Sequence, residues 1–172
     1  METLDFIKQS LETARNTTLE LVSELEEHYL HWQVENNANT IGFLLFHTFR
    51  TEDFRFAQIG EEPEFWKMGN WSNRWTLPEQ IEADRNTGFG WGESQMNKFN
   101  SPSLEDLLGY GATVRFRSLE VLNSMSTEKL NENIEGETDN VSALLFRLLA
   151  HESQHTGQID YILGLIGEQN NQ

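Results

Sequence analysis

The chain has 172 residues, 28 acidic and 12 basic side chains, a net charge of −16 and no cysteine. Apolar residues make up 37% and charged residues 23%, which is typical of a globular protein, and we expect residues 1–172 to form a single domain. The strong negative charge argues against nucleic acid and anionic membrane surfaces as partners, and the lack of cysteine excludes disulfides and thiolate nucleophiles of the chain itself.

The N-terminal sequence predicts a cytoplasmic protein. Residues 1–6 do not form the basic segment of a secretory signal, and no apolar segment of signal type follows them. Apolar runs also stay well short of the about 20 residues that a membrane-spanning helix needs.

Four long segments have helical periodicity, and the first two predict the core of a bundle. The first extends from about Leu4 to Glu27 and repeats apolar residues in steps of three and four. The second begins after the capping residues Asn39 and Thr40 and reaches about Ile59. It is apolar on almost every face, so we expect it to be central and deeply packed.

The third and fourth segments complete an all-α four-helix bundle. The third follows Ser101 and Pro102, which we interpret as a cap with proline at the first helical position, and reaches about Met125. Its inner line includes two small residues, expected to leave space beside a site: Leu107, Gly111, Val114, Ser118 and Val121. The fourth follows Asp139 and Asn140 and reaches about Ile166, with Gly167 as its predicted end.

A long crossover separates the second and third segments. It spans about forty residues, far more than an ordinary helix–helix connection, and would allow these two helices to be parallel. A capping-box pattern, Thr76-Leu-Pro-Glu79, predicts a short helix in it, and residues 88–92 predict a loop. Four of the five tryptophans lie in this segment: Trp66, Trp71, Trp75 and Trp91. These tryptophans could pack the crossover against the bundle, form the wall of a pocket over the metal, or do both.

Three histidines interrupt apolar helical stripes. His151 and His155 are four residues apart, so they lie one above the other on the apolar face of the fourth helix. His47 lies on an apolar line of the second helix. A buried imidazole without a partner costs about 1–3 kcal/mol, whereas one divalent ion satisfies all three rings together. The alternative is a set of ordinary core or surface histidines.

Two sharper motifs overlap this segment and are weaker explanations. His151-Glu-Ser-Gln-His155 matches the H-E-x-x-H signature of zinc proteases, but the spaced glycine and third histidine of the longer motif are missing, and no edge strand is predicted to hold a peptide. Glu152 and His155 match the E-x-x-H of di-iron bundles, yet no second such pair occurs in the chain.

Four further polar residues are candidates for other roles. Glu152 lies about 100° around the helix from His151, so it either lies beside the metal or pairs with an arginine, and the structural role is favoured. Gln158 is one turn beyond His155 and is a candidate to orient that ligand or to line the pocket. We interpret His28 and His31 as surface or loop residues.

The chain resembles the DinB-like (YfiT-like) metalloenzyme superfamily. The resemblance rests on residues 39–53, which place a metal-binding histidine at His47, and on residues 148–159, which place ligands at His151 and His155. Trp32 and the Trp-rich crossover also resemble the family, so the likeness covers nearly the whole chain. One departure is Thr156, where the family often has an arginine.

The resemblance implies a four-helix bundle with a long crossover, frequent homodimers and a divalent metal such as zinc, nickel, iron or manganese. Characterised relatives include transferases and isomerases that use a low-molecular-weight thiol to transform a small-molecule substrate, and many members have no known activity. The leading hypothesis is therefore a metal-dependent enzyme, with thiol-dependent S-transfer as its activity. A metallohydrolase of the same fold and a non-catalytic, metal-stabilised bundle are the alternatives.

Overall fold

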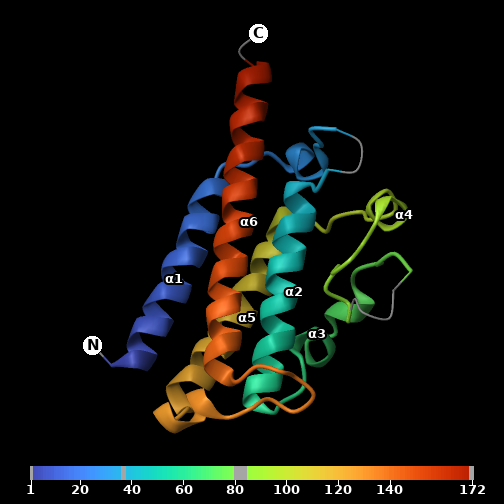
Figure 1. Ribbon diagram of the computed structural model, residues 1–172. Helices are drawn as coiled ribbons and strands as arrows, with labels where there is room; N and C mark the ends of the chain where they lie inside the picture. Colours follow the sequence, from blue (N-terminus) through green and yellow to red (C-terminus); the bar gives the residue numbers. More distant parts are fainter. Residues whose placement is uncertain (1, 36–37, 80–84, 171–172) are drawn as a thin grey trace.

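Four long helices form the body of the protein (Figure 1). The computed structural model describes residues 2–35, 38–79 and 85–170. The long helices are α1 (Thr3–Val22), α2 (Ile41–Gly60), α5 (Leu104–Ser124) and α6 (Val141–Asn170). The shorter elements are η1 (Glu27–His31), α3 (Phe65–Met68), η2 (Trp71–Asn73), α4 (Glu93–Met96) and η3 (Thr127–Asn131). The predicted all-α four-helix fold is confirmed, and the described part contains no β-strand.

The long crossover makes the two middle helices parallel. In Figure 1, α2 and α5 both descend, whereas α1 and α6 both rise. The segment between α2 and α5 carries the chain back along the whole bundle, as its length predicted. None of the described helices has the length and apolar character needed to cross a membrane.

α1 ends earlier than the sequence predicted. α1 ends at Val22 instead of near Glu27, because the Ser23 hydroxyl donates to the carbonyl of Glu20 and competes with a further helical turn. The exposed residues His28 and His31 then belong to the separate turn η1, as predicted for surface or loop positions.

The cap of α5 is Ser103. Its hydroxyl accepts a hydrogen bond from the Asp106 amide at 3.1 Å, so the helix begins at Leu104 and Pro102 lies before it. The expected cap at Ser101 and Pro102 is therefore wrong. α6 also continues past Gly167, because one glycine in a helix costs only about 1 kcal/mol and does not end it alone.

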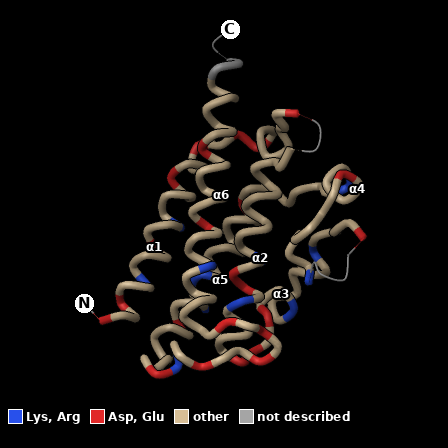
Figure 2. Tube along the Cα trace, viewed as in Figure 1, with Lys and Arg blue, Asp and Glu red and all other residues tan. Residues whose placement is uncertain are grey.

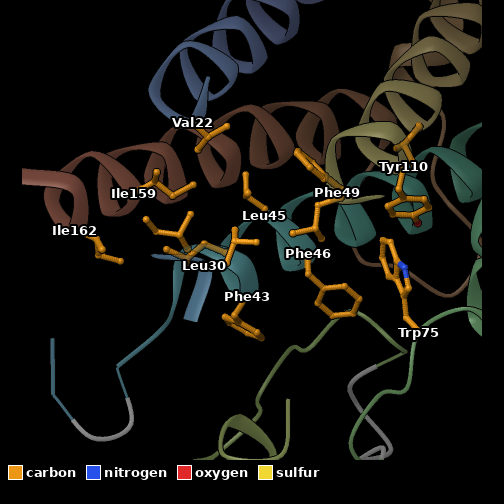
Figure 3. Packing of buried hydrophobic residues seen from close by; sticks show 14 of the residues in the cluster. Val22, Leu30, Phe43, Leu45, Phe46, Phe49, Trp75, Tyr110, Ile159 and Ile162 are labelled. Atoms are coloured by element: carbon orange, nitrogen blue, oxygen red, sulfur yellow. The ribbon is translucent and has the colours of Figure 1, made fainter. Parts of the chain in front are cut away.

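α2 is the centre of the core, as its apolar sequence predicted. Every residue from 41 to 50 is buried, and the helix packs against both α5 and α6. Its first turn is capped by the Thr40 hydroxyl, which accepts from the Phe43 amide at 3.1 Å. Figure 3 shows the side chains of Phe43, Leu45, Phe46 and Phe49 spreading from this helix into the surrounding core.

The tryptophans fix the crossover to the bundle. The rings of Trp66, Trp71 and Trp75 surround Tyr110 of α5, with centroid separations of 5.9, 5.3 and 5.4 Å. Figure 3 shows Trp75 beside Tyr110. Trp91 stacks on Phe46 at 5.9 Å. The structural role proposed for these residues is therefore confirmed.

A buried carboxylate anchors the same segment. Asp53 of α2 accepts hydrogen bonds from the amides of Phe65 and Trp66 at 2.8 and 2.7 Å and from the Tyr110 hydroxyl at 2.7 Å. The short helix predicted from Thr76 is not formed by residues 76–79, and its remainder, residues 80–84, lies outside the described residues.

The small residues of α5 bring two helices together. A Cβ atom on Gly111 would lie 2.7 Å from the ring of Phe49, so glycine at this position allows α5 to pack closely against α2. The Ser118 side chain is fully buried and donates to the Val114 carbonyl at 3.0 Å. The expectation that these residues leave space beside a site is wrong at Gly111.

This close approach predicts opposite effects for two glycines of one helix. Gly111→Ala should lower the free energy of unfolding by about 1–3 kcal/mol, because the added methyl group overlaps the Phe49 ring. Gly109→Ala, where an added Cβ meets nothing within 4 Å, should raise it by about 0.5–1 kcal/mol. Urea denaturation measures both, and equal stability of the two variants would contradict the packing described.

Candidate metal centre

Three imidazole rings converge between α2 and α6. The Nε2 atom of His151 lies 2.9 Å from Nε2 of His47 and 3.1 Å from Nε2 of His155. One ligand atom from each of the three residues lies within 4.8 Å of the others. The structure thus brings together all three residues that the sequence singled out as ligands.

The outer nitrogens of two rings are held by hydrogen bonds. Nδ1 of His47 donates to the Thr87 carbonyl at 2.7 Å, and Nδ1 of His155 donates to Oε1 of Gln158 at 2.6 Å. A proton on Nδ1 leaves the lone pair on Nε2, which faces the other two rings. Gln158 therefore has the orienting contact that its spacing suggested.

The loop that carries Thr87 is shaped by the next residue. Gly88 has a φ of +84°, in the left-handed region, and a Cβ there would lie 2.8 Å from the ring of Phe43. That ring in turn stacks on His47, with centroids 5.6 Å apart and planes 6° from parallel. Backbone and aromatic contacts together fix the orientation of His47.

The protons of the cluster cannot satisfy all three rings. Burial lowers the pKa of His151 to about 3, with smaller effects from the neighbouring His155, His47 and Arg55, and burial also lowers the pKa of His155. The two rings are therefore neutral at pH 7. With Nδ1 protonated on His47 and His155, the single Nε2 proton available from His151 serves only one of its two short contacts. The other contact places two lone pairs against each other.

The donor set fits a divalent cation. Tetrahedral ligands at about 2.0–2.1 Å from a zinc ion are separated from one another by about 3.3 Å. The two short Nε2 separations of 2.9 and 3.1 Å need to grow by only a few tenths of an ångström to match. Three neutral nitrogens would leave one or more coordination positions open, which is the arrangement of catalytic rather than structural sites.

Glu152 faces away from the imidazoles and belongs to a buried ring of four charges, one from each long helix. Its Oε1 accepts from Nε of Arg15 at 2.6 Å, and its Oε2 accepts from Nη2 of Arg115 at 2.7 Å. The same two arginines also bind Glu52 of α2, at 2.6 Å from Arg15 and 2.7 Å from Arg115. The structural role favoured for Glu152 is confirmed.

In this ring the neighbouring opposite charges shift the pKa values of Glu52 and Arg115 more than burial does. Burial raises the pKa of Glu52, but the charges of Arg15 and Arg115 lower it further, to a net value of about 2. Burial lowers the pKa of Arg115, and Glu52 and Glu152 raise it well above its usual value. Glu52 and Arg115 are therefore both charged at neutral pH.

This contact argues against the two rival motifs. A zinc protease of H-E-x-x-H type needs its glutamate as a general base, and a di-iron bundle needs it as a ligand. Guanidinium groups instead bind both carboxylate oxygens of Glu152, and this residue is only 3% exposed.

A cavity of about 650 Å³ opens beside the histidines. His47 and His151 form part of its wall, together with Thr51, Phe54, Arg55, Arg85, Thr87, Phe89, Glu137, Leu144, Arg147 and Leu148. The described lining contains two phenylalanines and no tryptophan, so the prediction of a tryptophan wall over the metal is wrong. The cavity gives a small molecule access to the histidine cluster.

Sequence reasoning missed the charged ring and the arginines of the cavity. A signal for the ring was available, because Arg15 lies four residues after Leu11 and three before Thr18, on the apolar line of α1. A charge at such a position indicates a buried partner. No comparable signal marked the cavity arginines, which come from α2, α6 and the crossover.

The comparisons with known proteins agree with this architecture. Residues 10–159 match the family model of the DinB superfamily. The chain belongs to the DinB superfamily. Among solved structures, one described as "Crystal structure of the conserved protein of locus from Enterococcus faecalis" has a TM-score of 0.82 and 16% identity, covering 94% of this chain and 95% of that chain. At this identity the likeness shows a shared fold alone. The search of the curated proteins found no match.

Proposed function

We propose that this DinB-superfamily protein is an enzyme that uses one divalent cation, held by His47, His151 and His155, to activate an external nucleophile. The observation that carries the proposal is the convergence of three Nε2 atoms at the wall of a large cavity. A bound cation of this kind acts as a Lewis acid and lowers the pKa of a water molecule or thiol that it binds.

The residues of the chain supply orientation and access. Thr87 and Gln158 hold the outer nitrogens of two ligands, so the rings need little reorganisation when the cation binds. The cavity admits a small molecule next to His47 and His151. We favour thiol-dependent S-transfer on the family resemblance. Because the chain contains no cysteine, the sulfur nucleophile would come from a low-molecular-weight thiol.

Metal analysis and cobalt spectroscopy test this function. Tag-free wild-type protein should carry about one equivalent of a divalent metal, and His151→Ala should lose it, whereas His28→Ala, a change at an exposed histidine, should retain it. In the cobalt-substituted protein, 2-mercaptoethanol should produce a sulfur-to-cobalt charge-transfer band.

Two results would contradict the proposal. Equal metal content in wild type and His151→Ala would contradict the assignment of the metal to the three histidines. A cobalt spectrum that does not respond to any thiol would leave thiol transfer unsupported and favour a metallohydrolase or a closed structural site.

The hydrogen bond to His155 predicts a specific effect on metal affinity. Gln158→Met should weaken metal binding about 10–100-fold, because Nδ1 of His155 loses its acceptor while the helix and the three ligands remain. Gln154→Met, at an exposed position of the same helix, should leave the affinity unchanged. Competition with a chromogenic chelator measures both, and equal affinities would show that Gln158 does not orient the ligand.

A further inference from the structure

Arginines gather at the cavity beside the histidines in a strongly acidic protein. The chain has a net charge of −16 and only 12 basic residues, yet the described part of the cavity lining holds three arginines and one carboxylate. Figure 2 shows how sparse the basic residues are along the chain and that several lie in the lower half of the view, around α2 and α6. This concentration of positive charge favours a negatively charged ligand.

Two of the arginines already bind a carboxylate. Oε1 of Glu137 accepts from Nη1 of Arg55 at 2.6 Å, and it lies 3.4 Å from Nη1 of Arg85. Nε2 of Gln58 donates to the same oxygen at 3.2 Å. Burial raises the pKa of Glu137, but these hydrogen bonds and the charges of Arg55 and Arg85 outweigh burial and lower it. The geometry is thus suited to hold a carboxylate.

These guanidinium groups keep binding capacity beyond Glu137. Each guanidinium has five N–H donors, and the bonds that Arg55 makes among the described residues all use Nη1. The side chains of Arg85 and Arg147 are 51% and 53% exposed, although Arg147 also pairs with Asp139. Both Arg55 and Arg85 lie over the ring of Phe54, at 5.1 and 4.9 Å, which holds them at the cavity wall.

A threonine between the metal ligand and Arg55 adds a polar residue to the same wall. Oγ1 of Thr51 is inaccessible to solvent and has no hydrogen-bond partner among the described residues. Thr51 lies one turn after His47 on α2 and lines the cavity between the metal ligand and Arg55 in sequence.

From these observations we propose that the cavity binds a small organic acid, with its carboxylate held by Arg55, Arg85 and Arg147 and its reactive end facing His47 and His151. The inference rests on the proposed function. It narrows the substrate class to a thiol that bears a carboxylate, or to a carboxylate-bearing second substrate that reacts with the thiol. Thr156, at the position where relatives often carry an arginine, is buried, and its hydroxyl lies 2.6 Å from that of Thr18. The positive charge of the cavity wall therefore comes from Arg55 of α2, Arg147 of α6 and Arg85 of the crossover.

Matched thiols test this assignment in the cobalt-substituted protein. One series contains ω-mercaptocarboxylates with two to five methylene groups, and the other contains the mercaptoalcohols of equal length. The charge-transfer band gives the dissociation constant of each thiol. For at least one length, the acid should bind at least about tenfold more tightly than the alcohol, and added salt should reduce this ratio.

Variants identify the groups responsible. Arg55→Gln and Arg147→Gln should each reduce the ratio of acid to alcohol affinity several-fold while cobalt content stays at one equivalent. Arg147→Lys should retain part of the preference because it retains the charge. Arg117→Gln is the matched control, since Arg117 pairs with Glu62 outside this cavity and its loss should leave the ratio unchanged.

The possible failures are distinguishable. Equal affinities for acids and alcohols at every length, with a clear thiol band, would overturn the carboxylate assignment and leave the metal site intact. A preference that survives both arginine substitutions would also overturn it. Wild-type protein that binds no cobalt would contradict the proposed function itself, and this inference with it.

Discussion

Glu152→Gln is expected to lower the free energy of unfolding by about 3–5 kcal/mol, although the side chain keeps its size. The carboxylate binds Arg15 and Arg115, which are 4% and 7% exposed, so its neutralisation leaves two buried guanidinium groups with one carboxylate, Glu52, between them. Urea denaturation followed by circular dichroism measures the loss. Glu12→Gln, the same change at an exposed site of α1, should alter stability by less than about 0.5 kcal/mol.

A compensated variant separates charge pairing from a general need for polar groups. Replacing all four members of the ring together (Arg15→Met, Glu52→Leu, Arg115→Met and Glu152→Leu) removes every buried charge at once. Stability should return to near the wild-type value or exceed it, because a buried ion network is seldom better than apolar packing of similar volume. A Glu152→Gln variant as stable as Glu12→Gln would contradict the structural role of the ring.

The second large effect is linkage between metal and folding. At a free metal concentration about 100 times the dissociation constant, the cation should raise the free energy of unfolding of wild type by about 2.7 kcal/mol, because it binds the folded state through ligands from two helices. His155→Ala should lose this increment, and His31→Ala, at an exposed position of η1, should keep it.

Thermal or urea denaturation with added zinc, compared with excess chelator, gives the increment for each protein. The comparison is made within each variant, so any loss of intrinsic stability cancels. An increment in His155→Ala equal to that of wild type would place the stabilising metal elsewhere on this acidic surface.

The fold and the histidine cluster were predictable because both follow from the periodic spacing of residues along the sequence. Apolar residues on nearly every face of residues 41–59 indicate a central helix, and α2 is indeed the buried one. The spacing of His151 and His155 fixes them on one face of a helix, and their apolar surroundings direct that face to the core. His47 required one further assumption, that the two apolar faces meet.

The remaining features depend on which helices are neighbours, and periodicity does not encode this. Arg15 on the seam of α1 signals a buried partner but does not say that the partners are Glu52 and Glu152. The cavity arginines lie on faces that look like ordinary solvated surface in the sequence. Helix ends at Ser23 and Ser103 were decided by local hydrogen bonds that compete with neighbouring residues of similar type.

Anomalous X-ray diffraction from crystals of the metal-loaded protein shows whether the three histidines hold one cation. With data collected on both sides of the absorption edge of the added metal, we expect one strong peak about 2.0–2.1 Å from Nε2 of each of His47, His151 and His155. Its remaining coordination positions should face the cavity that contains Arg55. A fully loaded crystal with no peak between these rings, or with its peak on surface carboxylates, would contradict the three-histidine site.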